Sequence, residues 1–286
     1  MHPGELPAEL TEQDFEIAVR KLADDLRYGP DPSRYVGSGI DYAQSRPFAQ
    51  GDPIKDIDWR VTARTGRYHV KEYEVLKSTP VYLVVDTSAS MAFSSQATSK
   101  HVLATLLAGG LGIASLARLS PVGVLDAAER DLHFQPSLSR ARLFQWLHEL
   151  RHRRFDEKTQ LAKRLEQLGE LLPVRSLVIT ISDLHDPAAI AAVKKVAQRH
   201  DMIVLHLEDP AEQGLAGGGI FRGQEAETGR QFVAHGRTRW FGEERSVDRD
   251  LRGAGIDYLH LSTDKPFVPA VRRLMMNRGQ MHRNAR

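Results

Sequence analysis

The sequence predicts an α/β fold: a doubly wound, mostly parallel sheet with one antiparallel edge strand, preceded by an irregular N-terminal segment. From residue 79 onward, apolar stretches of strand length alternate with longer segments of helical periodicity, which is typical of a sheet covered by helices on both faces. A short hairpin over 122–135 supplies the antiparallel edge strand. The residues before 79 are rich in Gly, Pro, Asp and Arg after a first helix, so we expect two parts, 1–78 and 79–286.

Each element of this prediction rests on a local pattern. A first helix is expected over 10–26, where Phe15, Val19, Leu22 and Leu26 follow helical spacing before the breaker sequence YGPDP. Alternation then predicts strands at 81–85, 122–126, 131–135, 174–181, 202–207 and 256–261. Helices are expected at 96–118, 139–151, 160–172, 187–199, 241–253 and from 266 onward, and a glycine-rich insertion with a hairpin follows residue 207.

Composition restricts the class of protein. The chain has 286 residues, 41% of them apolar and 27% charged, and its net charge of +2 gives no strong electrostatic case for binding nucleic acid or a membrane surface. The absence of cysteine excludes disulfides, thiolate metal sites and cysteine nucleophiles. The most apolar helical run, 102–117, is shorter than the ~20 residues that a spanning helix needs. With no export signal at the N-terminus, we expect a cytoplasmic protein without a membrane span.

A run of oxygen-bearing side chains follows the first strand of the predicted sheet. The sequence VYLVVDTSASMAFSS, 81–95, places Asp86, Ser88 and Ser90 at the carboxyl end of that strand, where open α/β sheets bind their ligands. Spacing of two residues lets a tight loop turn one carboxylate and two hydroxyls toward a common point. Hard oxygen ligands of this kind suit Mg²⁺, so we expect these residues to form half of a solvent-facing metal site.

Two later residues are candidates for the rest of that site. Thr159 opens a predicted helix and Asp183 follows a predicted strand, so both lie at the same edge of the sheet. Thr159 could instead be an ordinary helix cap and Asp183 a loop acid, although Asp186 before Pro187 already supplies the next helix with a cap. A bound ion would keep one coordination position open for an acidic side chain of another protein.

These motifs together are similar to those of a known family. The DxSxS loop, the later Thr and the later Asp resemble the metal-ion-dependent adhesion site of Rossmann-like von Willebrand factor A domains. The stretch FAQGDPIKDIDWRVTARTGRYHVKEYE, 48–74, resembles the signature of the bacterial family called domain of unknown function 58, as do 206–232 and 258–267. The family commonly has glycines before the threonine, whereas this chain has Glu157 and Lys158.

The resemblance implies a role in binding rather than a reaction. Members of the family are often encoded beside MoxR-type AAA+ ATPases and are thought to act with them as adaptor or chaperone-like partners. It therefore implies Mg²⁺, or Mn²⁺ or Ca²⁺, at Asp86, Ser88, Ser90, Thr159 and Asp183, with a protein partner of this ATPase type. The sequence agrees with a non-enzymatic module, because no activated nucleophile or acid–base pair surrounds the loop.

The N-terminal signature allows two interpretations. Its charged residues could form a face that docks the partner, and the candidates are Asp52, Asp58, Arg60 and Arg64. Alternatively, Ile57 and Trp59 could anchor the segment, with Asp58 paired to Arg60 or Arg64. A metal-free interaction domain that docks through this segment is therefore an alternative to the metal-dependent one.

Two enzyme classes are alternatives to a binding module. HELRH, 148–152, matches the HExxH pattern of zinc peptidases, but a helical wheel places His148 and His152 opposite the apolar stripe of Leu143, Leu147 and Leu150. An aspartyl phosphatase needs a second acid two residues after its nucleophile, and Ser88 occupies that position. The sequence therefore favours a binding module over either enzyme.

Overall fold

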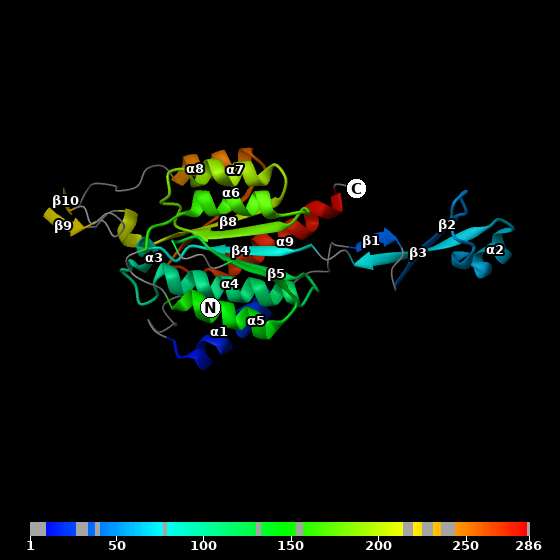
Figure 1. Cartoon of the computed structure of the whole chain (residues 1–286), viewed down its shortest axis with the longest axis horizontal. Coiled ribbons are helices and arrows are strands. Elements are labelled where there is room, and N and C mark those ends of the chain that lie inside the picture. The colour runs from blue at the N-terminus through cyan, green and yellow to red at the C-terminus, as the bar shows by residue number, and fades with distance from the viewer. Residues whose placement is uncertain are drawn as a thin grey trace. The chain divides into compact units, whose positions relative to one another are not determined.

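The computed structural model describes residues 10–26, 34–37, 41–76, 79–129, 133–152, 157–213, 220–224, 231–235 and 244–284. The chain divides into two compact units (Figure 1). Unit 1 comprises residues 1–29 and 79–281, and unit 2 comprises residues 30–78 and 282–286. In the described part of the chain, no helix is both long enough and apolar enough to cross a membrane.

A six-stranded sheet forms the centre of unit 1. Its strands lie in the order β11 (Asp257–Ser262), β8 (Asp201–Glu208), β7 (Leu177–Ser182), β4 (Val81–Val85), β5 (Val122–Asp126) and β6 (His133–Ser137). All neighbours are parallel except β5 and β6, which are antiparallel. Every residue of β4 and β5 is buried, as expected for strands covered on both faces. The predicted parallel sheet with one antiparallel edge strand is confirmed.

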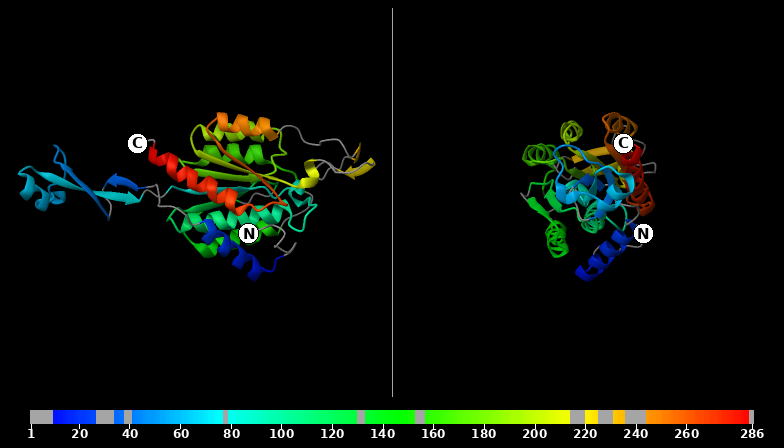
Figure 2. Two further views of the ribbon diagram at one scale, coloured as in Figure 1. Left: turned by 180° about the vertical axis from the view of Figure 1, so that it is seen from behind. Right: turned by 90° about the vertical axis from the view of Figure 1, so that its right-hand side faces the viewer.

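Helices cover both faces of this sheet (Figure 2). One apolar core lies between the sheet and α1 (Glu12–Leu26), α4 (Lys100–Leu116), α5 (Arg140–Arg151) and α9 (Val268–Asn284). A second core lies on the opposite face, under α6 (Leu161–Leu171), α7 (Ala189–Ala197) and α8 (Glu244–Gly253). Between the two layers, β4 and its neighbours deliver their carboxyl ends to one edge, where the loops gather.

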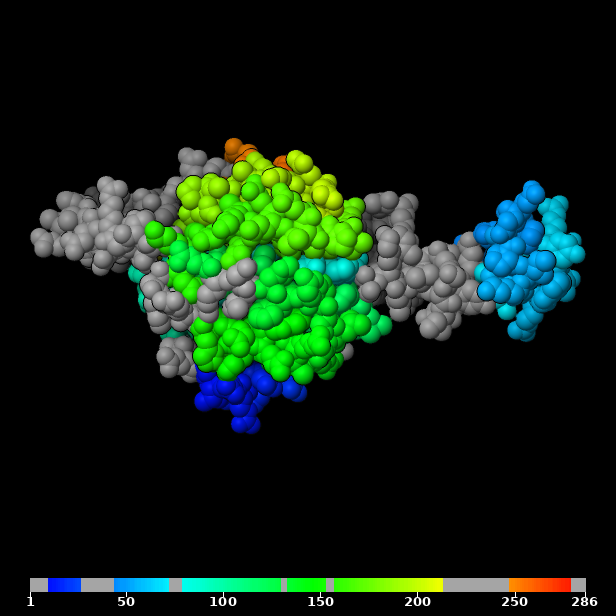
Figure 3. Space-filling model, in the orientation of Figure 1, coloured from blue at the N-terminus to red at the C-terminus, as the bar shows by residue number. Residues whose placement is uncertain are grey.

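The first helix is part of unit 1 rather than of the N-terminal segment to which the predicted boundary at residue 78 assigned it. Its apolar stripe is buried against α4, and a Cβ added to Gly109 or Gly110 would lie 2.7 Å from Val19 or 2.6 Å from Leu22. Figure 3 shows α1 directly beside α5 on the surface of the unit. An amphipathic helix must bury its stripe somewhere, and the glycines of α4 supply a surface close enough to receive it.

Unit 2 contains a small sheet that the sequence analysis did not anticipate within its irregular segment. Strands β1 (Arg34–Gly37), β3 (His69–Leu76) and β2 (Asp41–Pro47) pair antiparallel in that order, with a register shift in β2 between Tyr42 and Gln44. A single turn of 3-10 helix, η2 (Ile54–Asp56), precedes α2 (Trp59–Thr65). Polar and charged residues interrupt the apolar alternation of these strands, so the sequence pattern does not reveal them.

Element boundaries differ from prediction at the loop that follows β4. The helix expected at 96–118 corresponds to α4, which starts at Lys100 because Ser99 caps it by accepting the backbone N–H of Val102 at 3.3 Å. A short helix that was not predicted, α3 (Ala89–Ala92), precedes it. The glycine-rich insertion after β8 contains the 3-10 helix η3 (Pro210–Gln213) and the predicted hairpin, formed by β9 (Ile220–Gln224) and β10 (Gln231–His235).

Candidate metal centre

Strand β4 delivers the DxSxS loop to the carboxyl edge of the sheet. Asp86 follows the last residue of β4, and its backbone N–H donates to the carbonyl of Ile181 in β7 at 2.9 Å, which fixes where the loop starts. Ser88 precedes α3, but its hydroxyl does not cap that helix. The Ser88 Oγ instead lies 3.1 Å from the Ser90 Oγ, so the two hydroxyls converge.

The Asp86 carboxylate connects this loop to the segment before α6 and to the end of β7. Its Oδ1 accepts the backbone N–H of Ser88 at 3.0 Å, while Oδ2 accepts the hydroxyls of Ser182 at 2.7 Å and Thr159 at 3.1 Å. Thr159 lies just before α6, and Ser182 is the last residue of β7. The sequence prediction omitted Ser182, whose position immediately before Asp183 was the available signal.

Asp183 completes the cluster from the end of β7. It accepts a hydrogen bond from the hydroxyl of Ser90, and it lies close enough to Asp86 for their charges to repel. The five residues that the sequence singled out therefore lie together: Asp86, Ser88, Ser90, Thr159 and Asp183.

The cluster is more enclosed than predicted. We expected a solvent-facing site, but Asp86 and Ser88 have no exposed surface and Asp183 is 3% exposed. The backbone N–H of Ala89 donates to the carbonyl of Glu157 at 2.8 Å, which holds the segment before α6 against the DxSxS loop. Thr159, which is half-buried, is the most accessible of the five residues.

The two carboxylates have opposite pKa shifts. Burial, followed by the negative charge of Asp183, raises the pKa of Asp86 to about 6 against the hydrogen bonds from Ser88 and Ser182. Burial acts to raise the pKa of Asp183 as well, but the charges of Lys100 and His185 and the hydrogen bonds to that carboxylate outweigh it and hold the pKa at about 2. Asp86 is therefore the carboxylate whose ionisation the protein disfavours.

Three further polar residues, which the sequence did not indicate as part of a site, border the cluster. Lys100, the first residue of α4, is fully buried and donates from Nζ to Asp183 Oδ2 at 2.7 Å and to the carboxylate of Glu212 in η3. His185 Nδ1 lies 3.3 Å from the same Asp183 oxygen. Ligand atoms of Asp183, His185 and Glu212 all lie within 4.8 Å of one another. A lysine at the start of a helix is usually exposed to solvent, so the sequence did not predict the burial of Lys100.

The HELRH motif lies on α5, away from this cluster. Leu143, Leu147 and Leu150 are buried as predicted, and both histidines lie on the outer side of the helix. His148 Nε2 lies 3.2 Å from a Glu12 carboxylate oxygen, while His152 Nδ1 lies 2.8 Å from the backbone carbonyl of His148. Within the described residues, these side chains do not form a three-ligand group, so the geometry does not favour a zinc peptidase.

The acids predicted to bind a partner have structural roles within unit 2. Both Asp52 oxygens accept from the Arg46 guanidinium at 2.7 Å, and this hydrogen bonding lowers the pKa of Asp52 to about 2. Asp58 is the N-cap of α2, and the hydroxyl of Ser45 donates to its other oxygen at 2.6 Å. The Asp58 carboxylate therefore bonds to helix backbone rather than to the guanidinium of Arg60 or Arg64.

The remaining predictions for unit 2 divide between buried and exposed residues. Ile57 is buried and forms an isolated β-bridge with Val70 of β3, a contact within unit 2, whereas Trp59 is 62% exposed. Arg60 and Arg64 are also exposed, one helical turn apart on α2. Of the four residues predicted to meet a partner, these two arginines are the accessible pair.

Comparison with known proteins identifies the family. Residues 44–242 match the family model described as protein of unknown function DUF58. The chain belongs to this family. The DUF58 match spans both halves of the cluster, from the DxSxS loop to Asp183 and Glu212, and it confirms the family that the sequence motifs predicted.

The mycobacterial relatives of this DUF58 chain are described as uncharacterized proteins. Proteins of Mycobacterium bovis and Mycobacterium tuberculosis are 25% identical to it over 277 residues, which is 92% of this chain and 87% of each relative. The crystal structure of an aerotolerance-related membrane protein from Bacteroides fragilis aligns with a TM-score of 0.44 at 16% identity, covering 70% of this chain and 100% of that one.

Proposed function

We propose that unit 1 binds one divalent cation through Asp86, Ser88, Ser90, Thr159 and Asp183, and that the ion serves to capture a protein partner. The observation that carries the proposal is that these side chains converge from the loop after β4, the segment before α6 and the end of β7. Hydrogen bonds from Thr159 to Asp86 and from Ser90 to Asp183 link them. All five offer hard oxygen ligands, which favours Mg²⁺, with Mn²⁺ and Ca²⁺ as substitutes.

The electrostatics of the cluster fit a dication. Asp86, Asp183 and Glu212 carry negative charge when ionised, and the ammonium of Lys100 offsets one of them. Two negative charges are then left in a buried region, where unpaired charge is costly. A dication balances them and relieves the repulsion from Asp183, which together with burial keeps the pKa of Asp86 high.

A bound ion would supply a coordination position for a carboxylate of the partner, at the side where Thr159 is accessible. We propose a binding role rather than catalysis, because the carboxylate to which the Thr159 hydroxyl donates, Asp86, is itself a proposed ligand of the ion and would not be free to act as a general base. The family resemblance makes a MoxR-type AAA+ ATPase, or a client of one, the first partner to test.

Co-purification with and without divalent metal tests this function. The full chain should retain a candidate ATPase in Mg²⁺ and release it in EDTA, and the Ser88→Ala/Ser90→Ala variant should not retain it in either buffer. Ser115→Ala is a matched control, because its hydroxyl bonds to its own helix at Leu111. Capture of the ATPase that persists in EDTA would contradict a metal-dependent role.

A second candidate is a metal-free module that docks through unit 2. It is favoured by the Asp86 carboxylate, whose hydrogen bonds to Ser182 and Thr159 satisfy it without an ion, and by the exposed pair of Arg60 and Arg64. In the same assay, Arg60→Glu/Arg64→Glu should then abolish capture in both buffers, whereas Ser88→Ala/Ser90→Ala should have no effect.

A further inference from the structure

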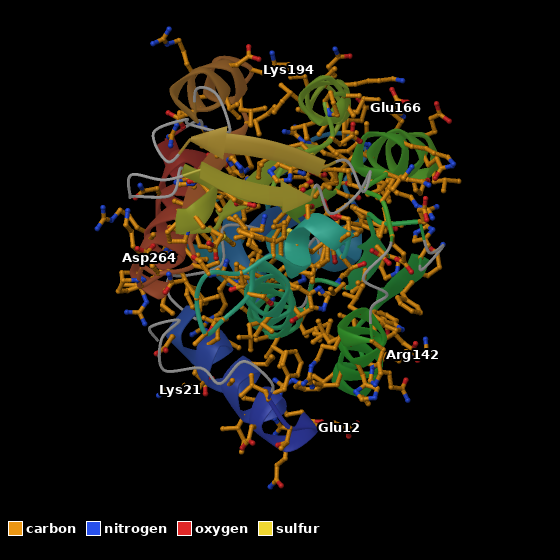
Figure 4. All side chains as sticks on the ribbon, turned by 90° about the vertical axis from the view of Figure 1, so that its left-hand side faces the viewer. Glu12, Lys21, Arg142, Glu166, Lys194 and Asp264 are labelled. Atoms are coloured by element: carbon orange, nitrogen blue, oxygen red, sulfur yellow. The ribbon has the colours of Figure 1, made fainter. Side chains whose placement is uncertain are left out.

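Lys100 is an unusual residue for the interior of a protein. Its side chain has no exposed surface, whereas other charged side chains of unit 1, such as Lys194 and Glu166, lie at the periphery (Figure 4). Lysine is almost never fully buried unless its charge is paired. Here the ammonium contacts two carboxylates, Asp183 and Glu212, which are themselves buried.

The ammonium lies where the surrounding side chains would otherwise bind a metal ion. Asp183, His185 and Glu212 bring two carboxylate oxygens and an imidazole nitrogen within 4.8 Å of one another. Two carboxylates and an imidazole are a ligand set that suits Mn²⁺ or Zn²⁺. The Lys100 Nζ donates to both carboxylates of this set, so the ammonium of the lysine occupies the place that a metal ion would take.

Hydrogen bonds that do not involve Lys100 hold Glu212, one of these three potential metal ligands, in place. The other Glu212 oxygen accepts the backbone N–H of Asp209 at 2.8 Å. Asp209 in turn accepts the N–H of Ser95, from the loop after α3, at 2.9 Å and the hydroxyl of Thr263 at 3.1 Å. These bonds hold η3 against the loops of β4 and β11, so Glu212 should stay in place when the lysine is shortened.

We propose that Lys100 is a built-in cation that fills a second metal position formed by Asp183, His185 and Glu212, and so restricts this chain to one divalent ion. Asp183 is shared between the two positions: one neighbour is the DxSxS loop and the other is the ammonium. Removing the ammonium should convert the second position into a metal site. An ion pair that serves only for stability would be lost on the same substitution without any gain in metal binding.

Counting bound Mn²⁺ per full-length chain tests the proposal, by calorimetry and by electron paramagnetic resonance of the free ion. Lys100→Ala should bind one more Mn²⁺ than the wild type, and Lys100→Ala/His185→Ala should lose that gain. Lys194→Ala is the control, because Lys194 pairs with Asp250 at the surface, 2.6 Å away, and its removal should add no ion.

The difference between the variants separates this inference from the proposed function, on which it rests only through the shared Asp183. If the wild type binds no Mn²⁺ and Lys100→Ala binds one, the proposed function fails, while the assignment of Lys100 to a metal position formed by Asp183, His185 and Glu212 stands. Equal numbers of ions in both proteins overturn the inference. If Lys100→Ala folds only with Mn²⁺, the metal has replaced the missing charge and the inference is supported, whereas a variant that stays unfolded at saturating Mn²⁺ contradicts it.

Discussion

The surroundings of the Asp86 carboxylate both oppose and favour its ionised form. It is fully buried beside a second carboxylate, yet it accepts hydrogen bonds from Ser88, Ser182 and Thr159. Replacing it by alanine would leave those donors without an acceptor in a buried region, which costs roughly 1–3 kcal/mol for each group. Asp86→Asn keeps an acceptor and removes the charge, so it is the better substitution for isolating electrostatics.

The contribution of Asp86 to the stability of the metal-free protein should fall as the pH rises from 4.5 to 7.5. The folded-state pKa of Asp86 is about 6 and exceeds the ordinary value of 3.8, so its protonation favours the folded state at low pH. This contribution is lost as the pH rises through about 6, by on the order of 1–3 kcal/mol. Denaturant unfolding in EDTA should therefore show wild type less stable than Asp86→Asn at pH 7.5, and similar to it at pH 4.5.

Comparing the two proteins removes contributions from other groups, such as His206, whose pKa burial lowers to about 4. Magnesium at pH 7.5 should stabilise the wild type and not Asp86→Asn. A difference between the two proteins that does not change with pH would show that the pKa of Asp86 is not raised in the folded protein.

Among the elements, the contact between α1 and α4 depends on glycine. Gly110→Ala places a methyl group 2.6 Å from the side chain of Leu22, which forces the helices apart and should destabilise unit 1 by about 1–3 kcal/mol. Gly253→Ala in α8 is the matched control, because nothing lies within 4 Å of its added Cβ. Thermal unfolding should show a lower midpoint for Gly110→Ala only, and equal midpoints would mean that α1 does not pack as described.

Elements with strong local patterns were predictable, and those fixed by distant contacts were not. The apolar run of β4, the alternation that follows it and the DxSxS loop placed the five cluster residues at one edge of the sheet. The partner of α1 could not be read from its own stripe, because any apolar surface would satisfy it. Burial of Lys100 depends on Asp183 and Glu212, which lie 83 and 112 residues away in the sequence, and no local pattern reports such a pairing.

At the scale of the whole chain, the two proposed ways of capturing a partner belong to different units. Unit 1 holds the cluster on a sheet in which β4 and β5 are wholly buried, so the cluster residues start from fixed positions. Unit 2 offers the exposed pair of Arg60 and Arg64, while its acids Asp52 and Asp58 stabilise its own turn and helix. Metal-dependent capture and arginine-dependent capture are therefore separable by variants in different units.

Calorimetric titration of Mg²⁺ into the full chain at pH 7.5 tests the central claim most directly. Five converging oxygen ligands with two uncompensated negative charges predict one bound ion per chain. The Ser88→Ala/Ser90→Ala variant should lose this binding, and the Ser115→Ala control should retain it. A folded wild-type protein that binds no Mg²⁺, or a double variant that binds it as tightly as the wild type, would contradict the account.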